Sequence, residues 1–175
     1  MENIKNDLFL SLGSNIEPKI DNLTNAINLL NKEFQLKRLS YVYQTEPQDD
    51  IDQAYFYNIC AFYQTEIEDP FLILQKTQQI EKELGRVKDI SRPKGPRLVD
   101  IDIILFGNIE ISTEILSIPH KSMKKRNFVL IPLLEILNNH PIYIKEYDLR
   151  RFIKENDAQI VKKISELKIE RHFTN

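Results

Sequence analysis

Apolar and polar residues along the chain follow the periods of short strands and amphipathic helices. The apolar run Leu8–Leu12 ends at Gly13 and predicts a buried strand. Pro18 suits the first position of a following helix. An apolar stripe at spacings of three and four residues then marks the buried face of that helix: Ile20, Leu23, Ile27 and Leu30.

Two further strands are predicted in the next part of the chain. Phe34–Thr45 is rich in aromatic and β-branched residues, which favours a strand. Glu46–Gln53 is polar and contains one proline, as a loop does. Phe56–Thr65 then forms a second strand with two well-defined faces.

A second helix has clear signals at both ends. Asp69 is a good N-cap and Pro70 fits the first helical position, while Gly85 is placed to end the helix after Leu84. After the basic loop Arg86–Arg97, a last strand is predicted at 98–106, with a turn at 107–108.

The order strand, helix, strand, strand, helix, strand is that of the split βαβ arrangement. We therefore expect an α+β fold with a ferredoxin-like βαββαβ core, in which an antiparallel sheet carries both helices on one face. Beyond the core, Phe128–Leu137 predicts a helix despite Pro132. Segments 148–156 and 159–167 predict extra C-terminal helices, or a strand and a helix, and 168–175 is expected to be loosely ordered.

Composition narrows the class of protein. The length of 175 residues, with 42% hydrophobic and 29% charged residues, fits a single soluble domain over residues 1–175. Cys60 is the only cysteine, which excludes an intrachain disulfide and a Cys/His zinc pattern. The net charge of −2 gives no global attraction for nucleic acid or anionic membranes. We expect a cytoplasmic protein with neither partner, as a monomer or homodimer.

Two carboxylates stand out on the last predicted strand. Side chains alternate along a strand, so Asp100 and Asp102 share one face, about 7 Å apart, while Val99, Ile101, Ile103 and Leu105 face the core. Charges among aliphatic residues are costly unless they are paired or bind metal. Hard oxygen ligands suit Mg²⁺ that is shared with substrate phosphates. Pairs with the same spacing, such as Glu66/Glu68, lack this apolar context, and a solvated edge-strand face remains the alternative.

Basic residues flank this strand on both sides. The first group precedes it: Arg86, Lys88, Arg92, Lys94 and Arg97. The second follows it: His120, Lys121, Lys124, Lys125 and Arg126. A triphosphate needs such a cationic shell. For any single lysine, however, a solvated basic loop is the better explanation, and His120 could equally be structural. Phe56 and Asn58 share a strand face. This pair could bind a planar heterocycle, by stacking from Phe56 and edge hydrogen bonds from Asn58. Alternatively, Phe56 is a core residue and Asn58 a strand-end residue.

Several motifs occur in an order that resembles the hydroxymethyldihydropterin pyrophosphokinase family. They are Leu8–Asn15, Thr45-Glu46-Pro47, Asp52-Gln53, Phe56-Tyr57-Asn58, Gln78–Glu81, Leu84-Gly85-Arg86, Gly95-Pro96-Arg97 through Gly107, and Ile118-Pro119-His120 with Met123, Arg126 and Phe128. The resemblance covers about residues 8–141, and an ordered set of motifs is far more specific than any one of them.

The resemblance implies an enzyme that transfers pyrophosphate from ATP to 6-hydroxymethyl-7,8-dihydropterin in folate biosynthesis, giving AMP. Asp100 and Asp102 would hold two Mg²⁺ ions and act in catalysis with Arg86 and Arg97. The implied ATP-binding residues are Gln78, Glu81, Arg97, Ile103, Ser117, His120 and Arg126. The implied pterin-binding residues are Thr45, Glu46, Pro47, Phe56, Asn58, Asp100 and Phe128. Loops 47–54 and 86–94 would close over the substrates.

The chain departs from the family pattern at a few positions. Lys94 stands where the family often has Trp, Ile115 where some members have Arg, and Lys121 where an aromatic residue is frequent. A stand-alone enzyme is expected, because no dihydropteroate synthase domain follows. Two other functions remain open: another Mg-dependent phospho- or nucleotidyltransferase using the same Asp pair, or a non-enzymatic ferredoxin-like binding module.

Overall fold

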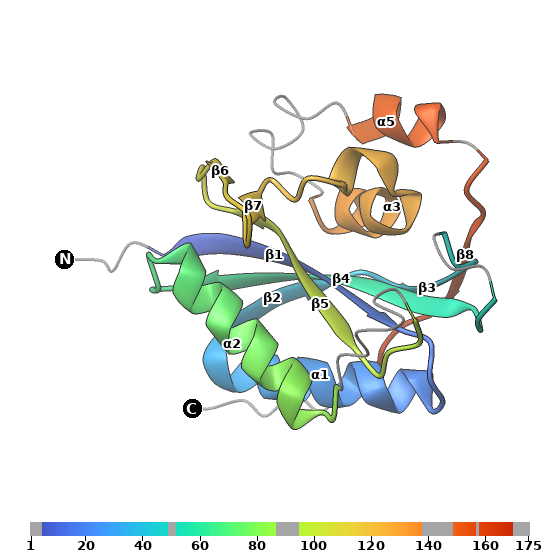
Figure 1. Ribbon diagram of the computed structural model, residues 1–175, viewed down its shortest axis with the longest axis horizontal. Coiled ribbons are helices and arrows are strands. Elements are labelled where there is room, and N and C mark those ends of the chain that lie inside the picture. Colours follow the sequence, from blue (N-terminus) through green and yellow to red (C-terminus); the bar gives the residue numbers. More distant parts are fainter. Residues whose placement is uncertain (1–4, 49–51, 87–94, 138–148, 157, 170–175) are drawn as a thin grey trace.

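The computed structural model describes residues 5–48, 52–86, 95–137, 149–156 and 158–169 (Figure 1). The elements follow in this order: β1 (Asn6–Ser14), α1 (Lys19–Glu33), β2 (Gln35–Leu39), β3 (Val42–Thr45), β4 (Phe56–Thr65), α2 (Pro70–Glu83), β5 (Asp100–Phe106), β6 (Ile111–Ser112), β7 (Ser117–Ile118), the 3₁₀ turn η1 (Met123–Lys125), α3 (Asn127–Ile136), α5 (Leu149–Glu155) and β8 (Val161–Ser165). Within the described residues, no helix has the length and apolarity needed to cross a membrane.

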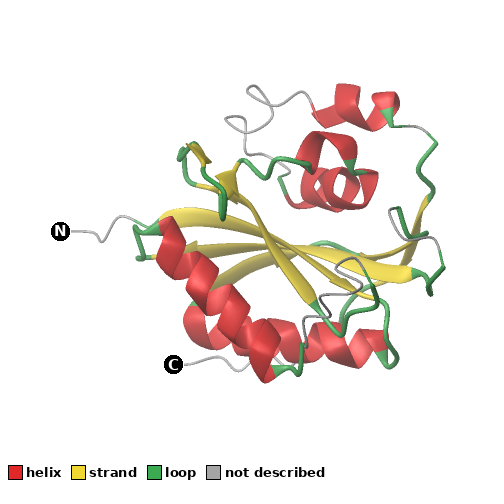
Figure 2. Ribbon diagram, in the orientation of Figure 1, coloured by secondary structure: helices red, strands yellow, loops and turns green. Residues whose placement is uncertain are grey.

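One antiparallel sheet organises the chain. Its strands lie in the order β5-β1-β4-β3-β8, and β2 also pairs with β4. Figure 2 shows helices α1 and α2 on one side of the sheet and α3 and α5 on the other. The α+β class is confirmed, and the central order β5-β1-β4-β3 fits the expected ferredoxin-like core.

Each face of the sheet has its own apolar core. The stripe predicted for the first helix is largely buried, and Leu23, Ile27 and Leu30 pack against the sheet together with residues of α2. On the other face, Phe9 stacks on Phe62 with ring centroids 4.7 Å apart, and α3 covers them with a second set of buried side chains: Val129, Leu130, Leu133 and Ile136. The second face is therefore covered by the C-terminal half of the chain.

The signals predicted for α2 are present in the structure. The Asp69 side chain accepts a hydrogen bond from the N–H of Phe71 at 2.9 Å, and Pro70 occupies the first turn. Gly85 has φ +90°, a conformation that favours glycine, and it follows the last turn of the helix. The strand predicted at 56–65 and the helix containing Pro132 are also confirmed.

Several predicted boundaries were wrong. Pro18 is the extended N-cap residue of α1, and the helix begins at Lys19. The single strand expected over 34–45 is divided into β2 and β3, because Ser40 leaves the strand path and its hydroxyl accepts from the N–H of Cys60 at 2.9 Å. Beyond α5, segment 159–167 contains strand β8, which pairs with β3, and no helix.

The prediction that alternate residues of β5 all face the same core is wrong at the C-terminal end of the strand. Ile101 and Ile103 lie in the core against α1 and α2, as expected, but Leu105 lies in the core against α3. The register between β1 and β5 shifts between Phe9 and Leu10, so Ile104 is an extra residue on β5. This bulge leaves the Asp100–Asp102 part of the strand in regular register with β1.

Candidate active site

A cleft of about 610 Å³, open to solvent, lies where β1, β4 and β5 meet the start of α3. It is lined by Ser11, Gly13, Thr45, Glu46, Gln48, Gln53, Phe56, Asn58, Arg97, Asp100, Asp102, Arg126 and Phe128. Nine of these residues were predicted from the sequence for metal, nucleotide or pterin binding: Thr45, Glu46, Phe56, Asn58, Arg97, Asp100, Asp102, Arg126 and Phe128.

Strand pairing brings both aspartates to the cleft. Asp100 lies opposite Gly13 and Asp102 opposite Ser11 on the neighbouring strand β1. The small side chain of Ser11 and the absent side chain of Gly13 leave room beside the two carboxylates. The predicted shared face is therefore observed, and it faces a cleft.

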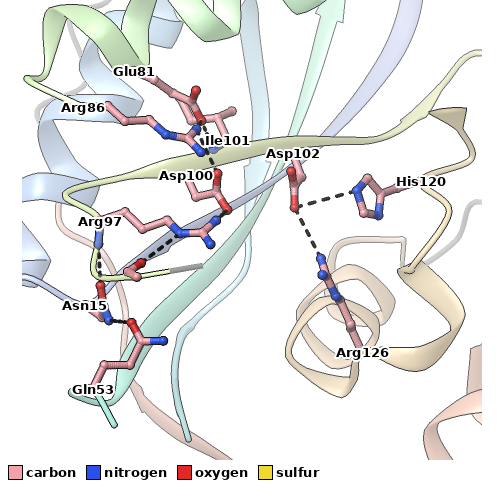
Figure 3. A network of polar contacts seen from close by, with 11 residues as sticks. Asn15, Gln53, Glu81, Arg86, Arg97, Asp100, Ile101, Asp102, His120 and Arg126 are labelled. Carbon is pink, nitrogen blue, oxygen red and sulfur yellow. Dashed lines mark hydrogen bonds and ion pairs between the residues drawn. The ribbon is translucent and has the colours of Figure 1, made fainter. Parts of the chain in front are cut away.

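Asp100 is surrounded by guanidinium groups. Its carboxylate forms ion pairs with Arg97, from the preceding turn, and with Arg86, whose Nη1 lies 2.9 Å from Oδ1 (Figure 3). Arg86 also pairs with Glu81 on α2. The Glu81 carboxylate in turn accepts from the N–H of Ile101 at 2.7 Å, which ties β5 to α2 between the two aspartates. Burial raises the pKa of Glu81, against the effects of the Ile101 hydrogen bond and of Arg86.

Asp102 has weaker cationic contacts. Arg126 Nη1 lies 3.7 Å and His120 Nε2 4.0 Å from Oδ2 of Asp102 (Figure 3). Burial, reinforced by the charge of Asp100, raises the pKa of Asp102 to about 7. Its negative charge is thus poorly compensated by the surrounding side chains.

His120 is neutral at physiological pH, because burial and the nearby Arg126 lower its pKa to about 4. Its Nδ1 accepts from the N–H of Ser122 at 3.3 Å, so the proton of the neutral ring lies on Nε2, toward Asp102. His120 was open to a structural or a functional interpretation, and it lies at the edge of the carboxylate pair.

The donor set fits a divalent cation that keeps most of its ligands from water and substrate. The residues that the structure describes contain no cluster of three or more His, Cys, Asp or Glu side chains able to hold a metal. Asp100 and Asp102 offer two carboxylate ligands, and a cation between them would offset the burial and the mutual repulsion that raise the pKa of Asp102. This is the arrangement that suits Mg²⁺ bound with phosphates, and it does not suit an all-protein metal cage.

An aromatic and amide-lined region occupies the other end of the cleft. Phe56 lies on β4 opposite Thr45 of β3, and Phe128 comes from the first turn of α3. Asn58, only 3% exposed, donates from Nδ2 to the hydroxyl of Thr45 at 2.8 Å. Flat rings and a fixed amide are what a planar heterocycle needs for stacking and edge recognition.

Gly13 is a site residue that sequence reasoning did not assign. A Cβ at this position would lie 3.0 Å from Oδ1 of Asn58 and 3.7 Å from Phe56. A side chain here would therefore press on the Asn58 amide, which would have to move by a few tenths of an ångström, while Phe56 would remain in ordinary contact. Its signal in the sequence was the end of an apolar run, which also fits an ordinary turn.

Asn15 is a second unassigned residue, and it joins two segments around the cleft. Its Oδ1 accepts from the N–H of Arg97 at 2.8 Å, and its Nδ2 donates to Oε1 of Gln53 at 2.8 Å (Figure 3). It thereby fixes the Gly95–Arg97 turn relative to the loop before β4. Ser11, Gln48 and Gln53 also line the cleft without having been predicted as site residues.

Other predicted residues lie outside the cleft lining. Gln78 is exposed on α2, and the Ile103 side chain is buried in the core. The hydroxyl of Ser117 on β7 donates to the carbonyl of Pro119 at 3.2 Å. Pro47 is half-buried beside the lining residue Glu46. Lys88, Arg92 and Lys94 fall outside the described residues. So do residues 87–94 of the loop 86–94, which was expected to close over the substrates.

Comparison with known proteins gives one consistent result. The family model described as 7,8-dihydro-6-hydroxymethylpterin-pyrophosphokinase (HPPK) matches residues 9–138. A 2-amino-4-hydroxy-6-hydroxymethyldihydropteridine pyrophosphokinase of Bacillus subtilis is 41% identical over 135 residues, covering 76% of this chain and 79% of its own length. The Aquifex aeolicus protein of the same name is 36% identical, covering 85% of this chain and 91% of its own length.

Some relatives are much longer than this chain. The folic acid synthesis protein FOL1 of Dictyostelium discoideum is 38% identical over 138 residues, but the match spans 78% of this chain and only 20% of that protein. Among solved structures, a Plasmodium falciparum HPPK-DHPS with pteroate covers the whole chain and 49% of its own length, with a TM-score of 0.62 and 19% identity. That structural likeness supports the fold.

Proposed function

The chain belongs to the 7,8-dihydro-6-hydroxymethylpterin-pyrophosphokinase family, and we propose that it transfers pyrophosphate from ATP to 6-hydroxymethyl-7,8-dihydropterin in folate synthesis. One observation carries the proposal beyond family membership. A carboxylate pair, Asp100 and Asp102, lies in the same cleft as an aromatic and amide-lined region and next to three arginines.

The pterin occupies the part of the cleft lined by Phe56 and Phe128. Its ring stacks against these two side chains, and Asn58, held by Thr45, reads the edge of the heterocycle. The backbone of the Thr45–Pro47 segment adds hydrogen bonds to the same edge. The hydroxymethyl group then points toward Asp100 and Asp102.

Two Mg²⁺ ions held by Asp100 and Asp102 would neutralise phosphate charge and act as Lewis acids when bound. Arg97 and Arg86 leave part of their pairing with Asp100 to bind phosphate oxygens, so that charge developing in the transition state is balanced. Arg126 and neutral His120 serve the same phosphates from the side of Asp102.

The nucleotide base lies along the outer edge of the sheet, where β5 is the last strand. Since the Ile103 side chain is buried, any contribution of this residue to ATP binding comes from its backbone. Gln78, Glu81 and Ser117 complete the proposed ATP-binding set. Of these, Glu81 also has the positioning role described above, through its hydrogen bond to Ile101.

The reaction is an in-line displacement on the β-phosphorus of ATP. The hydroxymethyl oxygen forms a bond to the β-phosphorus and loses its proton, the bond from the β-phosphorus to the oxygen bridging to the α-phosphorus breaks, and AMP leaves with that oxygen. We also place the enzyme in the cytoplasm, acting on small molecules alone.

The test is product analysis with ATP, Mg²⁺ and 6-hydroxymethyl-7,8-dihydropterin. We expect AMP and the dihydropterin pyrophosphate in equal amounts, and loss of AMP when the pterin is omitted. Asp102→Asn should reduce the rate by orders of magnitude, whereas Glu68→Gln, from the exposed Glu66/Glu68 pair, should not change it. Pyrophosphate release in place of AMP would indicate a nucleotidyltransferase, and the proposal would then be abandoned.

A further inference from the structure

The turn that carries Arg126 and Phe128 is tied to the C-terminal segment through Asn127. This residue is 3% exposed, and its Nδ2 donates to the carbonyls of Asn156 at 2.8 Å and Ile153 at 3.2 Å. Ile153 lies in the last turn of α5 and Asn156 directly follows the helix. Their carbonyls also accept backbone N–H groups, from Asn156 at 3.3 Å and from Gln159 at 3.0 Å respectively. Asn127 therefore links the start of α3 to the end of α5.

Gln159 holds the backbone on both sides of Arg126. Its Oε1 accepts from the N–H of Asn127 at 2.8 Å, and its Nε2 donates to the carbonyl of Lys125 at 2.8 Å. One side-chain amide thus makes the two hydrogen bonds that a peptide unit of a neighbouring strand would make. Both peptide groups that flank Arg126 are fixed by it.

Asn156 adds a third tie one residue earlier. Its Nδ2 donates to the carbonyl of Lys124 at 2.9 Å and to that of Phe152 at 2.8 Å. The Lys124 ammonium also lies 5.1 Å from the ring centroid of Phe152. Three backbone groups around Arg126 are therefore held by two amide side chains about thirty residues further along the chain.

The side chains that depend on this turn face the cleft. The carbonyl of Arg126 accepts from the N–H groups of Val129 and Leu130 at 2.9 Å each, which begins α3. Its guanidinium lies 3.7 Å from Asp102 and 5.5 Å from the ring centroid of Phe128. A displacement of about 1 Å in a group that positions a substrate can cost up to about a hundredfold in rate.

We propose that Gln159, supported by Asn127 and Asn156, is a positioning residue for the reaction, acting through Arg126 and Phe128. This inference rests on the proposed function, since it assigns those two side chains to substrates. Gln159 and Asn156 do not line the cleft and lie beyond the residues matched by the family model. The C-terminal segment thereby contributes to turnover without touching substrate.

The test is a double-mutant cycle between Gln159→Ala and Arg126→Ala. We expect Gln159→Ala to lower kcat about tenfold in the wild-type background. In the Arg126→Ala background we expect less than about a twofold further loss, because coupled residues are not additive. Gln64→Ala is the matched control: Gln64 donates to Asp7 at 3.1 Å at the other end of β1 and β4, and its loss should leave kcat unchanged.

Binding provides a readout that does not depend on turnover. With a non-hydrolysable ATP analogue present, Gln159→Ala should weaken pterin binding by about threefold to tenfold in calorimetry, through Phe128. Gln159→Met keeps the side-chain length without hydrogen bonding and replaces the alanine variant if the latter does not fold.

The positioning role would be overturned if Gln159→Ala lowered kcat by the same factor in the wild-type and Arg126→Ala backgrounds. It would also be overturned if Gln159→Met had the kcat and pterin affinity of wild type. Failure of the proposed function is separate, because it would appear as absence of AMP formation by the wild-type protein. In that case the pterin affinity of Gln159→Ala is compared in the wild-type and Phe128→Ala backgrounds, and equal losses in both refute the inference.

Discussion

Removing the charge of Asp102 should stabilise the protein when no divalent cation is present. The structure gives the sign: burial and Asp100 raise the pKa of Asp102 from 3.8 to about 7. Above pH 7 the group is charged in both folded and unfolded states, and the folded state bears the unfavourable charge. As pH falls below 7, the folded state takes up the proton first, so this contribution to instability decreases progressively between about pH 7 and pH 3.8.

The magnitude follows from the same difference in pKa. Three pKa units correspond to about 4 kcal/mol, which is an upper bound for the change in the free energy of unfolding that this carboxyl causes. Because the side chain is 32% exposed, solvent screening reduces the expected effect to about 2 kcal/mol. In EDTA at pH 8.5, Asp102→Asn should therefore be more stable than wild type by about 2 kcal/mol, and the difference should shrink toward pH 5.

The assay is urea denaturation of wild type and Asp102→Asn at both pH values, with Glu68→Gln as the surface control. The low pKa of His120 makes both proteins lose stability below pH 6.5, and this effect cancels in the difference between them. Addition of Mg²⁺ at pH 8.5 should stabilise wild type and not the variant. A difference that is absent at pH 8.5, or constant with pH, would refute the argument.

Three further predictions concern the cleft and the scaffold. Asn58→Ala should weaken pterin binding at least about tenfold, and ATP binding far less, because the edge of the buried heterocycle loses the amide that Thr45 holds in place; equal losses in calorimetric titrations would contradict this role. Gly13→Ala should raise the KM for the pterin with little change in the KM for ATP, since the new Cβ displaces Asn58; an unchanged pterin KM would show that the contact is relieved elsewhere. Asp69→Ala should lower the free energy of unfolding by about 1 kcal/mol through loss of the α2 cap, while kcat remains that of wild type; a loss of activity would mean that the cap also fixes the positions of Gln78 and Glu81 on α2.

Elements with strong local signals could be predicted from the sequence. The strand 56–65 has two distinct faces, and α2 has a cap, a first-turn proline and a terminal glycine. The shared face of Asp100 and Asp102 follows from strand alternation, and the structure places both in a cleft. These features depend on neighbouring residues in the chain, which is why the pattern was sufficient.

Features that depend on pairing could not be predicted in the same way. The bulge at Ile104, which turns Leu105 to the other core, is defined by the register with β1. Likewise, the place of Gly13 against Asn58 and the bridge from Asn15 to Gln53 join segments about forty residues apart. The strand character of β8 depends on its pairing with β3, since its own sequence, VKKIS, has three polar residues among five.

The central claim is that Asp100 and Asp102 hold cations beneath the nucleotide. The most direct measurement is anomalous diffraction from crystals grown with Mn²⁺, a non-hydrolysable ATP analogue and the pterin. We predict anomalous peaks within coordination distance of both carboxylates and of phosphate oxygens. A fully bound nucleotide with no peak at either aspartate would contradict the account.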